Sequence, residues 1–302
     1  MSQPSPEWIA VDWGTSNLRA WVIGSDGQVI AALSSDKGMG TLTRDGFEPA
    51  LLGLLSPYLP ATGKLPIIAC GMVGARQGWI EAPYLPTPYA APGLEQATRP
   101  KVRDARLDVQ ILPGVQQASP PDVMRGEETQ IAGYLRATPD FDGVLCLPGT
   151  HTKWVHISAR EIVSFRTFMT GEMFALLSTQ SVLRHSVDSP DWDRGAFLDA
   201  VSDAMGAPQR FASRLFSLRA GSLLDGVSPA TSRSRLSGLL LGLEIAGARD
   251  YWLGREIVLI GAPRLTDLYR QALAAQGAAV RETDGAEIAL GGLRAAFEET
   301  TT

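Results

Sequence analysis

Short apolar runs separated by turn residues dominate the first part of the chain. Three such runs lie at residues 8–12, 18–23 and 28–33, and the turns between them read Gly-Thr-Ser-Asn (14–17) and Ser-Asp-Gly (25–27). Runs of this length bounded by Asp-Gly and similar turns are typical of β-hairpins. The pattern therefore predicts three consecutive antiparallel strands.

The same unit occurs a second time further along the chain. Its apolar runs and turns alternate in the order 143–147, 148–152, 153–157, 158–160 and 161–165. Each copy is followed by a helical pattern, at 47–55 in the first and at 172–183 in the second. An internal repeat of this kind indicates two similar α/β domains.

The rest of the chain alternates between strand-like and helical patterns. Strands are expected at 66–70, 109–112 and 256–260, and helices at 128–135, 236–247, 265–275 and 287–298. Pro263 suits a first helical turn, where its missing N–H costs nothing, and Asp284 can cap the last helix. The proline-rich segment 81–98 is expected to be a long loop without regular structure.

These elements predict an α/β protein of two domains, which we place at 1–135 and 136–302, with the last helix able to return to the first domain. A length of 302 residues fits two domains of ordinary size. Hydrophobic residues make up 45% of the chain and charged residues 20%, which allows a sizeable core. The net charge of −5 argues against an extended basic surface for nucleic acid.

The cysteines and the apolar stretches of the sequence indicate in which cellular compartment the protein is expected. Cys70 and Cys146 lie in apolar runs and are expected to be buried, reduced strand residues rather than disulfide partners or metal ligands. Residues 1–8 lack the basic and apolar regions of a signal peptide. The longest apolar stretch, 236–248, is too short to span a bilayer. We therefore expect a cytoplasmic protein that binds no membrane.

The segment after the first strand is the first candidate for chemistry. Asp12 ends the apolar run, and the turn that follows contains Gly14, Thr15, Ser16 and Asn17. A glycine turn with hydroxyl and amide donors can hold phosphate oxygens. One carboxylate beside phosphates is a common arrangement for Mg²⁺. The alternative interpretation is an ordinary hairpin with an exposed aspartate.

Two further turns offer similar donors. The turn of the second repeat consists of Gly149, Thr150, His151, Thr152 and Lys153. Gly261 and Ala262 join a strand to a helix, an arrangement that suits a nucleotide because a helix N-terminus presents free N–H groups. The three turns together predict a phosphate-binding protein. The dinucleotide fingerprint, the P-loop and the Gly-x-Ser-x-Gly elbow are absent from the sequence.

Five separate segments, in family order, resemble the 2-dehydro-3-deoxygalactonokinase family of the actin/hexokinase/Hsp70 phosphotransferase superfamily. They are VDWGTSNLRAW (11–21), GMVGARQGWIEAPY (71–84), MRGEETQIAGYL (124–135), LPGTHTKWV (147–155) and FMTGEMFALLS (168–178). The resemblance extends over about residues 8–295. It implies two RNase H-like domains, each a mixed sheet flanked by helices, with a ligand cleft between them.

The resemblance also implies an activity. It is the transfer of the γ-phosphate of ATP, with Mg²⁺, to the 6-hydroxyl of 2-dehydro-3-deoxy-D-galactonate in galactonate catabolism. Many superfamily members carry an aspartate where this chain has Leu147-Pro148, which leaves Asp12 as the main acid on the metal side. The sugar acid and ATP are the partners expected, without nucleic acid. A homodimer is one option, and the sequence leaves the oligomeric state open.

Three other functions stay open on the residues. One is an exopolyphosphatase-like phosphohydrolase on the same fold, and the second is a 2-keto-3-deoxygluconate kinase. The third is a non-enzymatic sugar-sensing or assembly protein. The acidic charge and the tryptophan-rich segment 71–84 argue against the long basic channel of a polyphosphate hydrolase. Strand residues that begin by Trp8 leave no room for an N-terminal helix-turn-helix.

Glu127 and Glu128 are the candidates for the base that takes the proton from the attacking hydroxyl. They lie at the start of the predicted helix, and their similarity to the Glu-Glu segment of exopolyphosphatases implies that Glu128 acts on the nucleophile. The alternative is that acidic residues here complement the helix macrodipole. We expect one of the two to be structural and the other functional.

A sugar acid needs a cation for its carboxylate and acceptors for its hydroxyls. The candidate substrate residues are Arg76, Gln77, Trp79, Glu81, Thr170 and Glu172. The exopolyphosphatase comparison implies that Arg76 lies near the transferred phosphate. Glu172 is also well placed to be a capping acid, and Trp79, like Trp13, can be a packing residue instead.

Overall fold

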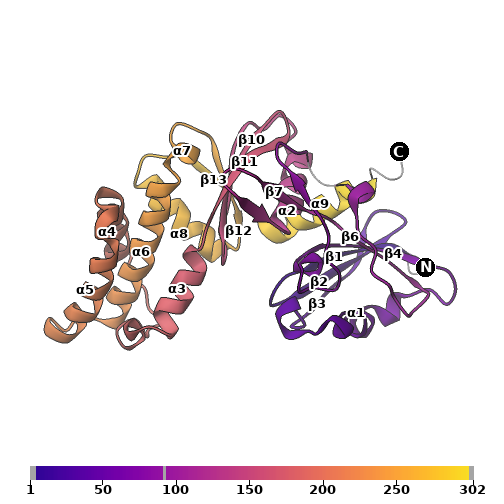
Figure 1. The fold of residues 1–302 in the computed structure, drawn as a ribbon, viewed down its shortest axis with the longest axis horizontal. Helices are drawn as coiled ribbons and strands as arrows, with labels where there is room; N and C mark the ends of the chain where they lie inside the picture. The colour runs from indigo at the N-terminus through magenta and orange to yellow at the C-terminus, as the bar shows by residue number, and fades with distance from the viewer. Residues whose placement is uncertain (1–4, 91–92, 299–302) are drawn as a thin grey trace. The chain divides into compact units, whose positions relative to one another are not determined.

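The computed structural model describes residues 5–90 and 93–298 of the chain (Figure 1). The three antiparallel strands expected at its start belong to a five-stranded sheet of order β3-β2-β1-β4-β6. These strands are β1 (Pro6–Trp13), β2 (Leu18–Gly24), β3 (Val29–Ser35), β4 (Leu65–Gly71) and β6 (Leu107–Ile111). β4 pairs in parallel with β1 and with β6, and α1 (Phe47–Leu55), at the residues predicted for it, connects β3 to β4.

A second sheet repeats this arrangement. Its order is β11-β10-β9-β12-β13. The strands are β9 (Gly143–Leu147), β10 (Thr152–Ser158), β11 (Glu161–Phe168), β12 (Ile257–Gly261) and β13 (Val280–Asp284). β9 pairs antiparallel with β10 and parallel with β12, as β1 does with β2 and β4. The internal repeat seen in the sequence is therefore confirmed as a repeat of sheet topology.

The chain forms two compact units. The first unit contains Met1–Phe141, Ser158–Ser164 and Gly285–Thr302, and the second contains Asp142–Ile157 and Phe165–Asp284. Helix α9 (Gly285–Glu298) thus belongs to the first unit, where it packs on α2 (Glu127–Ala137) and contacts β1 and β4. Helix α9 therefore packs against the elements α2, β1 and β4, which carry the first group of candidate residues.

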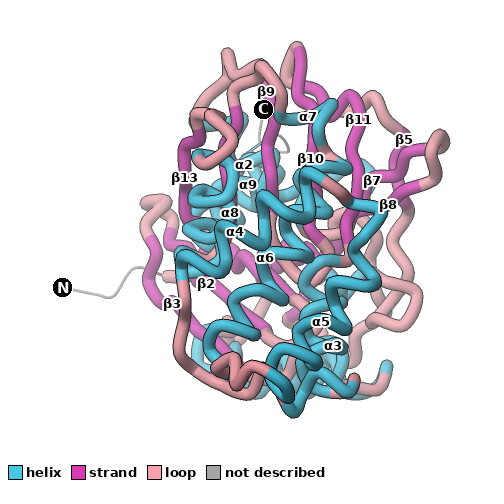
Figure 2. The backbone as a smooth tube through the Cα atoms, turned by 90° about the vertical axis from the view of Figure 1, so that its left-hand side faces the viewer, coloured by secondary structure: helices cyan, strands magenta, loops and turns pink. Residues whose placement is uncertain are grey.

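The second unit carries helices that the hydrophobic pattern shows only in part. They are α3 (Thr170–Thr179), α4 (Arg194–Gly206), α5 (Phe211–Leu224), α6 (Pro229–Gly247), α7 (Arg249–Trp252) and α8 (Pro263–Ala274). Helices α4, α5 and α6 run side by side (Figure 1, Figure 2). Glycine permits the closest approach: a Cβ on Gly238 of α6 would lie 2.3 Å from the carbonyl oxygen of Phe197 in α4.

The proline-rich segment is more regular than predicted. Residues 84–86 form β5 (Tyr84–Pro86), which pairs with β7 (Gly114–Gln117), and β7 pairs with β8 (Asp122–Met124). The expectation of an irregular loop over 81–98 is wrong here; residues 91–92 lie outside the described part. β5 tolerates Pro86 because it is an edge strand, where a missing N–H leaves no ladder bond unmade.

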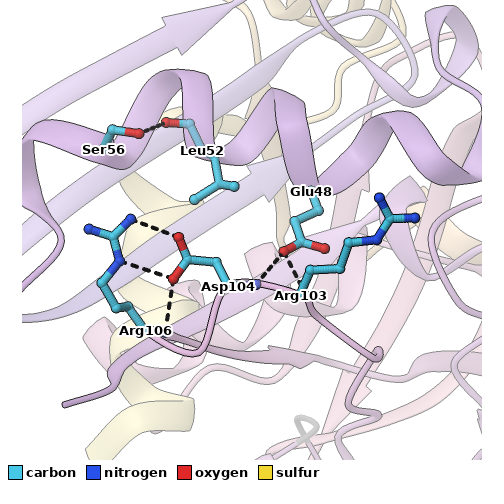
Figure 3. Close-up of polar contacts among 6 residues, drawn as sticks. All are labelled: Glu48, Leu52, Ser56, Arg103, Asp104 and Arg106. Atoms are coloured by element: carbon cyan, nitrogen blue, oxygen red, sulfur yellow. Dashed lines mark hydrogen bonds and ion pairs between the residues drawn. The ribbon is translucent and has the colours of Figure 1, made fainter. Parts of the chain in front are cut away.

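Polar contacts attach the connection before β6 to α1 (Figure 3). Glu48, in the first turn of α1, accepts hydrogen bonds at Oε1 from the backbone N–H groups of Arg103 and Asp104, both at 2.8 Å. Asp104 in turn binds the Arg106 guanidinium through two hydrogen bonds, of 3.0 and 2.7 Å. These hydrogen bonds hold the pKa of Asp104 at about 2.

Two expectations from composition can be checked in the fold. Cys70 and Cys146 are free, buried thiols on strands, as predicted. Among the helices of residues 5–90 and 93–298, none combines the length and the apolar character that crossing a lipid bilayer requires.

Candidate active site

Asp12 lies near the end of β1, with 17% of its side chain exposed. The strand register places it opposite Arg19 of β2 and beside Cys70 of β4. The Arg19 guanidinium donates to Oδ2 of Asp12 and forms an ion pair with it. The Asp12 carboxylate is therefore fixed by Arg19 and largely buried, which differs from the exposed aspartate of an ordinary hairpin.

The turn after Asp12 is fixed by backbone contacts and exposes its side chains. The N–H of Gly14 donates to the carbonyl of Asn17 at 2.9 Å, and the N–H of Gly40 donates to the carbonyl of Thr15 at 2.9 Å. Thr15, Ser16 and Asn17 are all exposed. The backbone is thus ordered while the hydroxyl and amide groups stay available to a ligand.

Two glycines bring the start of α2 to the edge of the first sheet. Gly71 ends β4 with φ of +92°, and a Cβ there would lie 2.8 Å from the carbonyl oxygen of Trp13 and 3.5 Å from Oδ1 of Asp12. Gly126, with φ of +106°, precedes α2, and its Cβ would lie 3.2 Å from the Cα of Gly71. Residues other than glycine rarely adopt such backbone φ values. The close approach of α2 to Asp12 therefore requires glycine at both positions.

Glu128 is completely buried in the first turn of α2. Both of its carboxyl oxygens accept from the N–H of Gly126, at 2.7 and 2.8 Å. Burial, and then the charge of Glu127, raise the pKa of Glu128 to about 7. Burial, followed by the charges of Asp12 and Glu128, also raises the pKa of the Cys70 thiol, and Cys70 is the register partner of Asp12 in the sheet.

Glu127 has a different environment from Glu128. Its Oε2 accepts from the backbone N–H of Arg125 at 3.1 Å. Both glutamates thus bind N–H groups at the helix start, as the macrodipole interpretation requires. Glu128 adds burial and a pKa near neutrality, the combination that suits a general base.

The predicted substrate residues of the first unit separate into exposed and buried groups. Arg76 and Glu81 are exposed, with Nε of Arg76 lying 3.8 Å from Oε2 of Glu81, and Gln77 is exposed beside them. Trp79 is buried in the core and stacks on Phe47, with ring centroids 6.1 Å apart. The structure therefore supports the packing alternative for Trp79.

In the second unit, the turn between β9 and β10 packs on the start of α3. The carbonyl of Thr150 accepts from the N–H of Glu172 at 3.0 Å, and Nε2 of His151 lies 2.6 Å from Oε2 of Glu172. A Cβ on Gly171 would lie 2.3 Å from the carbonyl oxygen of Gly149. Residues predicted separately for phosphate (149–151) and for substrate (170 and 172) are thus neighbours.

The strand-to-helix turn also adjoins this region. Gly261 ends β12, and a Cβ there would lie 3.5 Å from the carbonyl oxygen of Pro148. Ala262 precedes α8, and its carbonyl accepts from the N–H groups of Leu265 and Thr266. The second unit therefore gathers two predicted phosphate turns at one edge of its sheet.

Thr152 and Lys153 differ from the rest of the predicted turn because both are buried. Thr152 Oγ1 lies 2.7 Å from the hydroxyl of Tyr269, and Nζ of Lys153 donates to Oγ1 of Thr167 at 2.8 Å. The exposed members of the turn are Thr150 and His151. Direct contact with a ligand is therefore more readily made by 149–151 than by 152–153.

Sequence reasoning did not select Glu244 of α6. Its buried carboxyl accepts from Nε1 of Trp154 at 2.8 Å and from the hydroxyl of Tyr269 at 2.9 Å. The signal was present in the sequence, because Glu244 interrupts the apolar run 236–248. A charged residue inside a buried helix needs partners, and nothing in the linear pattern identifies them.

The residues around Asp12 fit a metal that is bound mainly by phosphate. Within the described residues, no three His, Cys, Asp or Glu side chains cluster in a way that could hold an ion by themselves. Mg²⁺ usually keeps several waters and takes one or two carboxylates in addition to substrate phosphates. A single shielded carboxylate beside an exposed donor turn meets that requirement.

Comparison with known proteins identifies the family. A family model described as 2-keto-3-deoxy-galactonokinase matches residues 12–296. The chain belongs to this family. A protein of Rhizobium meliloti (strain 1021), named a probable 2-dehydro-3-deoxygalactonokinase, is 44% identical and covers 96% of each chain. The 2-dehydro-3-deoxygalactonokinase of Escherichia coli (strain K12) is 33% identical and covers 95% of this chain and 96% of its own.

Solved structures agree with this family. A Sinorhizobium meliloti protein, provisionally named a 2-dehydro-3-deoxygalactonokinase, superposes with a TM-score of 0.90 at 44% identity over 97% of this chain and 99% of its own. An activator of 2-hydroxyisocaproyl-CoA dehydratase from Clostridium difficile shares only the fold, with a TM-score of 0.50 at 12% identity over 97% and 95% of the chains. The 2-keto-3-deoxy-galactonokinase family is one of sugar-acid kinases, so the phosphohydrolase alternative is not favoured.

Proposed function

We propose that the protein transfers the γ-phosphate of ATP to the 6-hydroxyl of 2-dehydro-3-deoxy-D-galactonate, in galactonate catabolism. The observation that carries this proposal is the 2-keto-3-deoxy-galactonokinase match over residues 12–296. The close approach of the start of α2, which carries Glu128, to Asp12 supports it, because phosphoryl transfer needs charge neutralisation and a positioned hydroxyl. A cytoplasmic location and a homodimer stay predictions.

In the first unit, Glu128 is the proposed base. Its ionised carboxylate accepts the proton of the 6-hydroxyl while the oxygen of that hydroxyl forms a bond to the γ-phosphorus. The bond from that phosphorus to the bridging oxygen of ADP breaks in the same step, so ADP leaves with the bonding electrons. Glu127, bound to the backbone of Arg125, holds the start of α2 in place.

Asp12 is the proposed residue on the metal side. Mg²⁺ held there with ATP would neutralise charge on the phosphate oxygens. Arg19, which forms an ion pair with Asp12, orients that carboxylate. The exposed donors of Thr15, Ser16 and Asn17 bind phosphate oxygens in this proposal.

The remaining contacts are divided between the units. In the second unit, Gly149, Thr150 and His151 bind phosphate, and the Gly261-Ala262 turn with the start of α8 binds the nucleotide. In the first unit, the exposed Arg76 is the cation for the anionic substrate, with Gln77 and Glu81 as hydroxyl partners. Thr170 and Glu172 act through the turn that they contact rather than through the sugar acid.

An ATP-coupled kinase assay tests this function. We expect turnover of 2-keto-3-deoxygalactonate with Mg²⁺ and much less of 2-keto-3-deoxygluconate, because a buried polar group left unpaired discriminates strongly between epimers. Asp12→Asn should lower that turnover and weaken its dependence on Mg²⁺ concentration. ATP hydrolysis that is unaffected by either sugar acid would overturn the proposal, and preferential use of the gluconate epimer would correct its substrate.

A further inference from the structure

A hydrogen-bond network inside the second unit surrounds the carboxyl of Glu244. Its oxygens accept from Nε1 of Trp154 and from the hydroxyl of Tyr269. Burial raises the pKa of Glu244 to about 7, against the hydrogen bonds from Thr170, Trp154 and Tyr269, which lower it. An apolar side chain in this helix would avoid the cost of burying a carboxylate. The network therefore needs a reason beyond packing.

The partners of Glu244 lie on both sides of the turn 148–151. Thr152 is the first residue of β10 and follows that turn, and its Oγ1 lies 2.7 Å from the hydroxyl of Tyr269. Thr170 is the first residue of α3 and is followed by Gly171 and Glu172, which pack on Gly149 and Thr150. Glu244 is thus linked to the turn by two routes, one through the hydrogen bond from Thr170 and the other through Tyr269 and Thr152.

When Glu244 is ionised, the number of available protons fixes the direction of each hydrogen bond in the network. Tyr269 has one hydroxyl proton, and it donates that proton to Oε2 of Glu244. The contact between Tyr269 and Thr152 must then be donated by Thr152. Thr152 Oγ1 is left with acceptor capacity toward the N–H of Gly149, which lies 3.5 Å away. The Glu244 carboxylate, at one end of this series of hydrogen bonds, therefore sets the orientation of the Thr152 hydroxyl, which faces the turn at the other end.

We propose that Glu244 is a positioning residue for nucleotide binding, which holds the turn 148–151 in its phosphate-binding conformation through Tyr269 with Thr152 and through Thr170. This inference rests on the proposed function, because that function assigns the turn to phosphate. Glu244 is buried beneath the turn and touches neither ATP nor the sugar acid in this proposal. Its effect should therefore be seen in nucleotide affinity rather than in the chemical step.

The test compares variants at both ends of the network. Glu244→Gln and Tyr269→Phe should each raise the KM for ATP and the dissociation constant for ADP by about tenfold, as loss of a buried hydrogen bond predicts. The kcat and the KM for the sugar acid should change less than about threefold. Thr152→Val should behave like Tyr269→Phe, whereas Thr152→Ser, which keeps the hydroxyl, should restore affinity close to that of the wild type.

Trp154→Phe is the matched control. It removes the hydrogen bond to Oε1 of the same carboxyl and leaves the path through Tyr269 to Thr152 in place. It should lower the midpoint of thermal unfolding with little change in the affinity for ADP. A structural role alone would instead lower stability in all variants and leave their affinities for ADP equal to that of the wild type, and this result would overturn the proposal.

Binding of ADP, measured by calorimetry without sugar acid, separates this inference from the proposed function. If the wild type binds ADP but phosphorylates no sugar acid, the proposed substrate is wrong and the variants still decide the role of Glu244. If the wild type binds no ADP, both proposals fail. If Glu244→Gln does not fold, the pair Thr152→Val and Thr152→Ser decides the inference on its own.

Discussion

Glu128 combines two properties at the scale of a single residue. Its carboxyl is fully buried at the start of a helix, and burial raises its pKa to about 7. A base with such a pKa is ionised for a large part of the time at neutral pH and still binds the proton that it accepts. Glu127, one residue earlier, shares the helix turn but binds the backbone N–H of Arg125.

This difference predicts distinct kinetics for the two glutamates. Glu128→Gln should lower kcat by about 10²- to 10⁴-fold, whereas the effect of Glu127→Gln should be about tenfold or less. The wild-type kcat should rise between pH 6 and pH 8, because the ionised form of Glu128 is the active one. Steady-state kinetics over this pH range provide the measurement. A Glu128→Gln enzyme with wild-type kcat would exclude Glu128 as the base.

The sequence identified candidate residues better than it identified their neighbours. Asp12 and Glu128 are predicted from local segments more than a hundred residues apart, and the structure brings the start of α2, which carries Glu128, to the strand end that carries Asp12. What brings them together is the pair of positive-φ glycines, Gly71 and Gly126, and their conformation depends on tertiary contacts. The burial of Thr152 was not predictable for the same reason, whereas packing was already an alternative for Trp79 on the sequence alone.

At the scale of elements, local periodicity was sufficient where an element has one clearly apolar pattern. The strand 143–147 and the helix 47–55 match their predicted bounds. Helix α5 was missed because its burial is weak: Leu218 is its buried residue, while Phe216 is 65% exposed and Leu224 82% exposed. A helix without a clear apolar face gives no periodic signal to detect.

The crossing of α2 and α9 predicts a stability effect that depends on one glycine. A Cβ on Gly292 of α9 would lie 1.8 Å from the carbonyl oxygen of Thr129, which is adjacent to Glu128 in α2. Gly292→Ala should therefore lower the free energy of unfolding by about 1–3 kcal/mol. It should also lower kcat, because the displaced turn carries the proposed base. Urea denaturation and steady-state kinetics measure the two effects.

Gly291 supplies the control in the same helix. A Cβ at that position would lie 3.4 Å from the Cα of Gly133, an ordinary contact. Gly291→Ala should be neutral or stabilising by up to about 1 kcal/mol, since alanine is the better helix former. Equal effects of the two substitutions would show that close packing of the helices does not explain why glycine occupies position 292.

At the scale of the whole molecule, each compact unit contains one buried carboxyl whose pKa is raised to about 7. Glu128 lies in the first unit and Glu244 in the second. In the unfolded chain both should titrate near the ordinary value of 4.5. Between these two pH values the folded protein holds protons that the unfolded chain has released. The free energy of unfolding should therefore decrease as pH rises from about 4.5 to 7 and then level off.

Substitution of each glutamate by glutamine shows which unit is responsible for each part of this pH dependence. As the pH rises from 5 to 8, the free energy of unfolding of Glu244→Gln should increase by about 1–3 kcal/mol relative to that of the wild type, because glutamine has no proton to release. Asp104, with a pKa of about 2, is already ionised throughout this range. Urea denaturation at several pH values, followed by probes in each unit, provides the measurement. The altered pH dependence of stability should appear in the unfolding transition of the second unit for Glu244→Gln and of the first unit for Glu128→Gln. Parallel stability curves for variant and wild type would mean that these carboxyls titrate at ordinary values in the folded protein, and the buried base of the proposed mechanism would lose its support.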